Sequence, residues 1–499
     1  MPSVFVFLLI ALPWLNPFAS APTPAVVPLL FSWACAALLL GVWGCGRGRP
    51  NAVPWVSVTA WAWLAAGLAS SLIGLCQYFG MADRFSPWIN QTVIGEAFAN
   101  LRQRNQFATL TSISLAALLW VVVNPGRLAA RQHGLMLLVA GVLAVGNAAS
   151  SSRTGLLQLG LLLLLYGFWG GLRHAAVRTV LLVVVGAYGS ATLALPWLAG
   201  LDLSTHGMVA RLQPGDQSCA SRLTLWANVL QLIAQKPWSG WGWGELDYAH
   251  FMTLYEGPRF CDILDNAHNL PLHLAVEFGV PLALAFCCGV VWWGIRRQPW
   301  RESDATRRLA WAVLAVIGLH SLLEYPLWYG PFQMAVGWCV IVLWRVKQAA
   351  GTRDKAHEAR ICKYTAPLTM VLMTALAYAA WDYHRVSQIY RAPEARDPDY
   401  REGTLDKIRS SWLFAEQVRF AELSLTPLRP ANAQWTFDTA LALLHYSPEA
   451  RVVEKVIESA VMLGRDDDAL LYLVRYRAAF PAEYTKWRHT NGLTDGPAQ

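Results

Sequence analysis

A polar interruption between two hydrophobic stretches carries the first residues that could do chemistry. The stretch before it ends near Trp197, the stretch after it starts near Leu270, and the interruption closes with Asp-Asn-Ala-His-Asn at residues 265–269. A histidine titrates near neutral pH, so His268 could take a proton from a hydroxyl group. We therefore predict that His268 is a general base. The alternative is a histidine that only caps or hydrogen-bonds the start of the next helix.

Four arginines are the next candidates, because a guanidinium group binds phosphate oxygens through paired, charge-assisted hydrogen bonds. Arg102 and Arg104 open a hydrophobic stretch, Arg153 follows three serines in a sharp turn, and Arg222 begins an amphipathic segment. Several arginines at one leaflet of a membrane predict a binding site for a lipid diphosphate. The alternative is that these side chains extend from helix ends to the headgroups without any ligand.

A third polar cluster follows another hydrophobic stretch. His320 and Glu324 have the i, i+4 spacing of a helical metal pair. However, Pro326 comes directly after Tyr325 and favours a shaped turn over a continued helix. We predict that Glu324 and Tyr325 face the same vestibule as His268, where carboxylates and aromatic rings can bind a sugar. A belt of interfacial aromatic residues would explain the same tyrosines and tryptophans.

Metal binding is the less favoured interpretation of the acidic residues near the histidine. Asp262 and Asp265 could hold a divalent cation with His268, but two carboxylates on a loop more often only cap and solvate it. No CxxC pair with zinc spacing occurs in the sequence. His273 and Glu277 share one face of a helix and are expected to satisfy each other.

The elements that must position these residues are membrane helices. Apolar residues make up 55% of the 499 positions and charged residues only 14%, which excludes an ordinary soluble domain. A helix needs about 20 apolar residues to cross the hydrocarbon of a bilayer. We predict an all-α polytopic membrane protein with about eleven spans, the first of which could instead be a signal peptide. The predicted spans are 3–19, 26–44, 55–79, 104–123, 133–149, 154–171, 175–198, 270–296, 306–323, 330–348 and 364–382.

Successive connections between these spans alternate between many and few lysine and arginine residues, as the positive-inside rule requires. With the N-terminus inside, the basic residues concentrate in the cytoplasmic connections, which places the 199–269 loop and the tail outside. In a bacterial inner membrane, outside means the periplasm. The net charge of +8 therefore reflects topology, and we expect no binding to nucleic acid. The domains predicted are a transmembrane part at 1–383 and a soluble helical tail at 384–499.

Two cysteines and the tail complete the predicted outer part. Cys219 and Cys261 both fall in the outer loop, where they are expected to form a disulfide or to remain two free thiols. In the tail, 449–464 and 466–480 have helical apolar spacing and resemble a tetratricopeptide hairpin. This hairpin could present a concave face to a protein acceptor or could pack on the outer loop.

The order of these motifs resembles the O-antigen ligase and polymerase superfamily and, more narrowly, the bacterial protein O-oligosaccharyltransferases that glycosylate pilins. The resemblance runs from about residue 1 to 385. It is carried by 100–105 (NLRQRN), 151–155 (SSRTG), 222–226 with 240–244 (GWGWG), His268-Asn269 with 277–279 (EFG), and 320–327 (HSLLEYPL).

The resemblance implies a bundle of the type shared by lipid-linked glycosyltransferases, with its active site facing the periplasm. It implies transfer of a preassembled glycan from undecaprenyl diphosphate, with inversion at the anomeric carbon and without a metal or other cofactor. His268 would be the base, and Arg102, Arg104, Arg153 and Arg222 would bind the diphosphate. Gln158, Tyr325 and Tyr329 lie where the family has functional polar residues. The soluble tail favours a protein acceptor, such as a pilin, over a lipid acceptor.

Other functions remain open from the sequence. A transporter or flippase of lipid-linked glycan would share the size and the lipid diphosphate. Transporters tend to hold charged groups near the bilayer midplane, whereas the charged groups here gather at one face, which favours an enzyme. Within enzymes, ligation to the lipid A core and polymerisation of O-antigen units are the alternatives.

Overall fold

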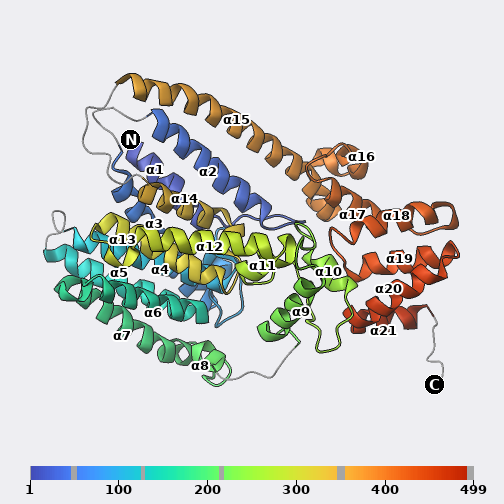
Figure 1. The fold of residues 1–499 in the computed structure, drawn as a ribbon, viewed down its shortest axis with the longest axis horizontal. Helices are drawn as coiled ribbons and strands as arrows, with labels where there is room; N and C mark the ends of the chain where they lie inside the picture. The colour runs from blue at the N-terminus through green and yellow to red at the C-terminus, as the bar shows by residue number, and fades with distance from the viewer. Residues whose placement is uncertain (1, 46–52, 125–129, 213–218, 345–354, 492–499) are drawn as a thin grey trace. The chain divides into compact units, whose positions relative to one another are not determined.

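The computed structural model describes residues 2–45, 53–124, 130–212, 219–344 and 355–491, and all regular structure within them is helical (Figure 1). Its contacts divide the chain into two compact units. The first joins Met1–Gly215 to Trp293–Ala380, and the second joins Asp216–Trp292 to Trp381–Gln499.

The first unit is a helical bundle whose centre is α4 (Arg104–Val123). This helix packs against α3, α5, α6 and α13, and 89% of its most apolar stretch is buried. Small and hydroxyl-bearing residues let the neighbouring helices approach closely, as is typical of membrane bundles. Ser114, for example, packs on Gly67 and donates a hydrogen bond of 2.7 Å to the carbonyl of Trp63. The other helices are α1 (Pro2–Leu15), α2 (Val26–Cys45), α3 (Trp55–Tyr78), α5 (Ala130–Ala149), α6 (Arg153–Phe168), α7 (Ala175–Leu198), α8 (Gly207–Leu212), α13 (Ala305–Ser321), α14 (Gly330–Trp344) and α15 (Lys355–Ser387) as far as Ala380.

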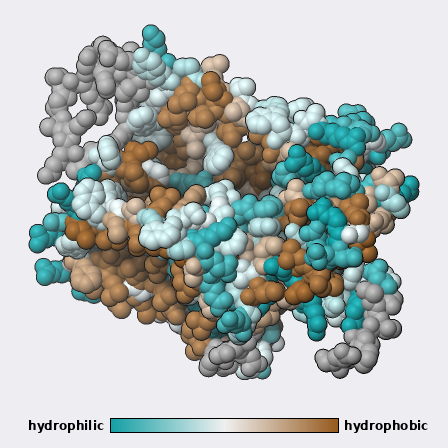
Figure 2. All heavy atoms as spheres, turned by 45° about the vertical axis from the view of Figure 1, so that its right-hand side comes forward, coloured by the Kyte–Doolittle hydropathy of each residue, from teal (hydrophilic) through white to brown (hydrophobic). Residues whose placement is uncertain are grey.

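Several helices of the described chain can span a membrane. Among the described residues, five are long and apolar enough, namely Val26–Cys45, Trp55–Tyr78, Arg104–Val123, Ala175–Leu198 and Val280–Arg301. Broad hydrophobic areas are visible on the surface (Figure 2). Residues of α7 such as Leu182 and Leu193 are also exposed. The chain is therefore a polytopic helical membrane protein. Eleven spans, and the side of the membrane on which each loop lies, stay predictions.

One predicted span is not a continuous helix. Residues 270–296 form α11 (Leu270–Phe278) and α12 (Val280–Arg297), which are separated by Gly279 with a φ of 87°. The carbonyl of Trp238 lies so close that a Cβ on Gly279 would sit 2.3 Å from its oxygen. Because a distant segment packs on this backbone, the helix ends there, and apolar periodicity alone does not reveal it.

The second unit joins the outer loop to the tail. Phe251 of α10 (Leu246–Met252) lies in one hydrophobic cluster with tail residues such as Phe437 and Tyr476. Arg475 donates a hydrogen bond of 2.9 Å to the carbonyl of Met252. Packing of the tail on the loop, one of the two roles left open by the sequence, is thus present. The remaining helices are α9 (Arg222–Gln235), α11, α12 as far as Trp292, α16 (Thr404–Ile408), α17 (Ala415–Leu425), α18 (Ala433–Leu443), α19 (Ala450–Met462), α20 (Asp466–Ala479) and α21 (Pro481–Thr490).

The predicted domain boundary near residue 383 falls inside α15, which continues unbroken to Ser387. By its contacts, the first unit ends at Ala380 and the second resumes at Trp381. The segment 216–292 belongs to the same unit as the tail. The paired tail helices expected at 449–464 and 466–480 are α19 and α20. Between them Gly464 takes a φ of 69°, a conformation that favours glycine.

Replacing Gly240 by alanine tests the packing of the loop on α11. Gly240 has a φ of 68°, and a Cβ would lie 2.3 Å from the carbonyl carbon and oxygen of Glu277. We expect Gly240→Ala to lower the free energy of unfolding by about 2 kcal/mol or more, because backbone strain adds to the steric clash. Thermal unfolding in detergent measures the loss. Gly257→Ala is the matched control, since nothing lies within 4 Å of its Cβ position; equal stability of the two variants would contradict the expected packing.

Candidate functional site

A buried carboxylate joins the segment after α13 to the start of α4 in the first unit. Glu324 follows α13, and its side chain accepts hydrogen bonds from Asn105 Nδ2 at 3.0 Å and Gln103 Nε2 at 3.2 Å. Its residue is only 5% exposed. Burial of a carboxylate is costly unless its oxygens are hydrogen-bonded, so the two amide donors account for its position. Glu324 is therefore fixed against the start of α4.

The same network fixes the start of α6. Ser152 Oγ donates to Asn105 Oδ1 at 2.6 Å and accepts from the backbone N–H of Gly155 at 3.0 Å as the N-cap. Ser152 is buried, whereas Arg153, the next residue, is exposed at the first turn of the helix. A helix N-terminus favours anions. This position suits a guanidinium group that meets a phosphate.

A second polar layer lies within the bundle. Thr109 Oγ1 is 2.9 Å from His320 Nδ1 and accepts a hydrogen bond of 2.8 Å from Gln158 Nε2. Gln158 also donates to the carbonyl of Val316 at 3.1 Å, and both Gln158 and His320 have no exposed surface. Gln158, predicted as a substrate-binding residue, thus lies in the bundle interior with protein partners.

The other predicted arginines of the first unit already have protein partners. Arg104 forms an ion pair with Glu96, and Arg102 donates to the carbonyl of Pro17. Their surroundings are half-buried, so a ligand phosphate would have to exchange with these partners. Beside Glu324, the rings of Tyr325 and Tyr329 stack with centroids 5.9 Å apart and offer an aromatic surface.

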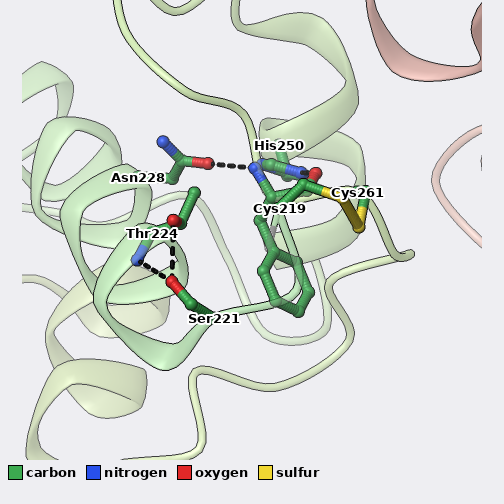
Figure 3. The surroundings of a disulfide bond; sticks show 7 residues. Cys219, Ser221, Thr224, Asn228, His250 and Cys261 are labelled. Carbon is green, nitrogen blue, oxygen red and sulfur yellow. Dashed lines mark hydrogen bonds between the residues drawn. A yellow bond between two sulfur atoms is a disulfide. The ribbon is translucent and has the colours of Figure 1, made fainter. Parts of the chain in front are cut away.

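His268 lies in the second unit, at the end of a segment that is fastened to α9. The disulfide joins Cys219 to Cys261 with their Cα atoms 5.3 Å apart (Figure 3). Asn228 of α9 accepts a hydrogen bond of 2.8 Å from the N–H of Phe260 and donates one of 3.0 Å to the carbonyl of Pro258. These attachments hold the course of the chain before it reaches His268.

The backbone at His268 is held in an uncommon conformation. Its φ is 51°, and its N–H donates to Asn266 Oδ1 at 2.9 Å. Trp226 of α9 donates its indole N–H to the carbonyl of Ala267 at 3.0 Å. Asn269 then caps α11 by accepting from the N–H of Leu272 at 3.0 Å. The half-buried imidazole is therefore presented from a backbone fixed on both sides.

A second histidine of this unit has a different character. His250 is buried, with Nδ1 2.8 Å from the hydroxyl of Tyr255 and Nε2 3.1 Å from the carbonyl of Phe260. Burial, together with the nearby Arg259, lowers the pKa of His250 to about 3. Because a carbonyl can only accept, Nε2 carries the proton and Nδ1 accepts from the tyrosine. His250 is thus occupied on both nitrogens and is unsuited to act as a base.

His273 and Glu277 lie side by side as expected, with Nε2 and Oε2 3.5 Å apart, but no hydrogen bond joins these two atoms, so mutual satisfaction is not borne out. Glu277 Oε1 also accepts from the N–H of Gly244 at 2.9 Å, which joins α11 to the glycine-rich loop. Among the described residues, no group of three His, Cys, Asp or Glu side chains has the arrangement of a metal site.

The predicted site residues fall on both units. Arg102, Arg104, Arg153, Gln158, Glu324, Tyr325 and Tyr329 belong to the first, and Arg222, His268 and the disulfide belong to the second. That both sets face one vestibule stays a prediction. The sequence did not single out Gln103, Asn105, Thr109 and Ser152 as individual site residues. The polar pair Asn105 and Thr109, four positions apart in an apolar helix, was the available signal.

Replacing Asn105 by alanine tests the network around Glu324. The change removes a donor to a buried carboxylate and the acceptor for Ser152, so we expect a loss of about 2–4 kcal/mol in the free energy of unfolding. Asn124→Ala at the other end of α4 removes a single hydrogen bond to the carbonyl of Trp120 and should cost about 1 kcal/mol. Thermal unfolding of both variants in one detergent gives the comparison. Similar losses would argue against a special role of Asn105.

Three family models match successive segments of the chain. Residues 97–121 match a protein glycosylation ligase, residues 136–287 match the O-antigen ligase family, and residues 308–492 match the C-terminal part of a virulence factor membrane-bound polymerase. The first segment contains Gln103 and Asn105, the second contains Arg153 and His268, and the third contains Glu324. Each cluster described above therefore lies in a matched segment.

Two related proteins come from Acinetobacter baylyi (strain ATCC 33305 / BD413 / ADP1). The general O-oligosaccharyltransferase is 25% identical over 322 residues, which cover 60% of this chain and 54% of the relative. The ComP-specific O-oligosaccharyltransferase is 25% identical over 289 residues, which cover 56% of this chain and 50% of the relative. The chain thus matches about half the length of these relatives, and no solved structure matches it. The resemblance predicted from the motifs is confirmed: segments of the chain match models of the O-antigen ligases and of a protein glycosylation ligase, and the two similar proteins are named O-oligosaccharyltransferases.

Proposed function

We propose that this protein transfers a preassembled oligosaccharide from undecaprenyl diphosphate to a serine or threonine hydroxyl of a periplasmic protein such as a pilin. The observation that carries the proposal is the ordered match to ligase families across the segments that hold the polar clusters. The names of the two relatives, both O-oligosaccharyltransferases, support a protein acceptor. The apolar helices fit a donor that is delivered within the membrane.

In the proposed reaction, the acceptor oxygen attacks the anomeric carbon of the glycan while the bond from that carbon to the phosphate oxygen breaks. His268 takes the hydroxyl proton, and the configuration at carbon inverts. Undecaprenyl diphosphate leaves with the bonding electrons and gains negative charge. The backbone contacts of His268 to Asn266 and from Trp226 to Ala267 support this role, because a base must be held in place to act on one hydroxyl.

Arginines are proposed to stabilise the charge that develops on the leaving group. Arg153 is the best placed, since it is exposed on the first turn of α6 beside Ser152, the N-cap residue of that helix. Arg102 and Arg104 would join it after exchanging Pro17 and Glu96 for phosphate, and Arg222 would act from the start of α9. Lipid-linked oligosaccharide, acceptor protein and membrane lipid are the partners of this proposal, and the protein would reside in a bacterial inner membrane.

Glu324 and Tyr325 are proposed to orient the sugar or the acceptor hydroxyl. The hydrogen bonds from Asn105 and Gln103 would keep the carboxylate fixed as the substrate binds. Tyr329, stacked on Tyr325, would extend the aromatic surface for a sugar ring. Gln158 is assigned a supporting role beneath this surface, because its amide is bonded within the bundle.

A second candidate function concerns the acceptor. The matches to the O-antigen ligase family and to a membrane-bound polymerase favour transfer to the lipid A core or to a growing O-antigen chain. The donor chemistry is the same in each case. Only the group that supplies the attacking hydroxyl differs, so the product separates the candidates.

Replacing His268 tests the proposed base. The chain is co-expressed with a pilin and a lipid-linked glycan pathway, and intact-mass spectrometry measures the mass added to the pilin. Loss of a general base lowers the rate by about 10²–10⁴-fold, so His268→Ala should abolish the added mass at normal membrane levels. His489→Ala, on an exposed tail position, is the control. Retained transfer would exclude His268 as the base, and a glycan on lipopolysaccharide without a glycan on pilin would favour the lipid acceptor.

Replacing Arg153 tests the diphosphate site. Loss of one charge-assisted contact is worth about 1.5–3 kcal/mol, so Arg153→Ala should lower kcat/KM for the lipid-linked donor by about 10–100-fold. The KM for the acceptor should change little, and Arg153→Lys should recover part of the loss. Arg477→Ala, exposed in the tail, serves as the control. Equal effects on donor and acceptor would contradict a role at the diphosphate.

A further inference from the structure

One face of α9 is apolar and exposed. Leu223, Ala227, Leu230 and Ala234, here called the apolar stripe, follow one another at the spacing of a single helix face. Leu223 is 75% exposed and Leu230 is 55% exposed. The opposite face is buried in the hydrophobic core of the unit through Leu225, Val229, Leu232 and Ile233. The helix is thus apolar on both faces, and within the described residues of the second unit the stripe stays exposed.

The end of α9 is fixed where the chain enters an apolar span. Pro237, two residues after the helix, accepts a hydrogen bond of 2.8 Å from the N–H of Val280. Val280 is the first residue of the membrane-span candidate Val280–Arg301. The backbone of Trp238 packs on Gly279, while its indole is 81% exposed. This attachment joins the C-terminal end of α9 to the first residue of a helix that is long and apolar enough to span a membrane.

The charges of α9 fit a position at a membrane surface. Arg222 and Lys236 flank the apolar stripe, and no aspartate or glutamate occurs between them. Cationic ends and an apolar face characterise helices that lie in the plane of a membrane surface and attract anionic headgroups. Trp238 and Trp243, both exposed, add the residue type that is enriched at this depth.

We propose that α9 is an interfacial helix: its apolar stripe inserts into the acyl boundary of the membrane, and the lipid surface is the partner that covers it. The inference rests on the proposed function and extends it, because it places Arg222 at the depth of lipid phosphates, where the diphosphate of the lipid-linked donor would lie. Its core claim, a lipid-covered α9, does not depend on which glycan or acceptor is used.

Photo-crosslinking tests the contact directly. The full-length protein carries p-benzoylphenylalanine in place of Leu230 and is reconstituted in vesicles of phosphatidylethanolamine and phosphatidylglycerol. After irradiation, intact-mass spectrometry should detect covalently attached phospholipid. Leu470, 60% exposed on α20 of the same unit, is the matched position and should capture little lipid. Equal capture at both positions, or capture of acceptor protein in place of lipid at Leu230, would overturn the proposal.

A charged residue on the stripe tests the consequence for the donor. Leu230→Glu should raise the apparent KM for the undecaprenyl-linked donor by about tenfold, because the carboxylate opposes insertion and repels anionic lipid. Turnover of a donor with a short, water-soluble prenyl chain should stay within about twofold. Gln231→Glu, at the next exposed position but beside the stripe, is the control. An unchanged KM would count against the proposal.

Two further readouts keep the outcomes separate. An intact Cys219–Cys261 disulfide, measured by mass under non-reducing conditions, confirms that the loop of each variant has folded. If no variant and no parent protein transfers glycan, the crosslinks still decide whether α9 contacts lipid. Failure of the proposed function and failure of the interfacial helix are therefore distinguishable.

Discussion

The buried carboxylate of Glu324 is the constraint on which the first unit depends. A carboxylate with 5% exposure is stable only when its oxygens are hydrogen-bonded, and the donors come from Asn105 and Gln103 at the start of α4. Asn105 forms a second hydrogen bond, because its side-chain oxygen accepts from the hydroxyl of Ser152, which caps α6. One amide thus ties three helices at the same end of the bundle. A functional surface built from their termini has a fixed shape before any substrate arrives.

In the second unit, a disulfide and local hydrogen bonds fix the segment that leads to His268. A short helix, α9, holds the segment that precedes His268 through the neighbouring disulfide, Asn228 and Trp226. The tail adds support from the other side of the loop, where His445 Nδ1 lies 2.7 Å from Glu245 Oε2. The tail is consequently part of the framework of the loop, and its packing contribution is separate from any role in binding an acceptor.

Much of this could be predicted from the sequence, because the information was local. Apolar runs gave the positions of helices such as α4 and α7, where hydrophobicity and helix length agree. The proximity of His273 to Glu277 followed from helical spacing alone. The break at Gly279 was missed, since its cause is a backbone contact with Trp238. The donors to Glu324 lie more than two hundred positions away along the chain, and no periodicity links them. The depth of Gln158 in the bundle depends on how α6 packs, which the sequence does not reveal.

Three motif segments share a backbone feature that single residues do not reveal. Arg102, Ser151 and His268 have φ values of 60°, 50° and 51°. Each is followed by one extended residue and then by the first residue of a helix, α4, α6 or α11 respectively.

A left-handed conformation costs a non-glycine residue about 1–3 kcal/mol. Glycine would avoid that cost but would remove the side chain and increase the freedom of the unfolded chain. The caps formed by Ser152 and Asn269 offset part of the strain at two of the turns. The repeated turn places the polar side chains of Arg102, Ser151 and His268 beside the N-terminus of a helix. The positive potential of a helix N-terminus favours an anion. Strain of this kind is consistent with a site that is organised in advance for a negatively charged leaving group.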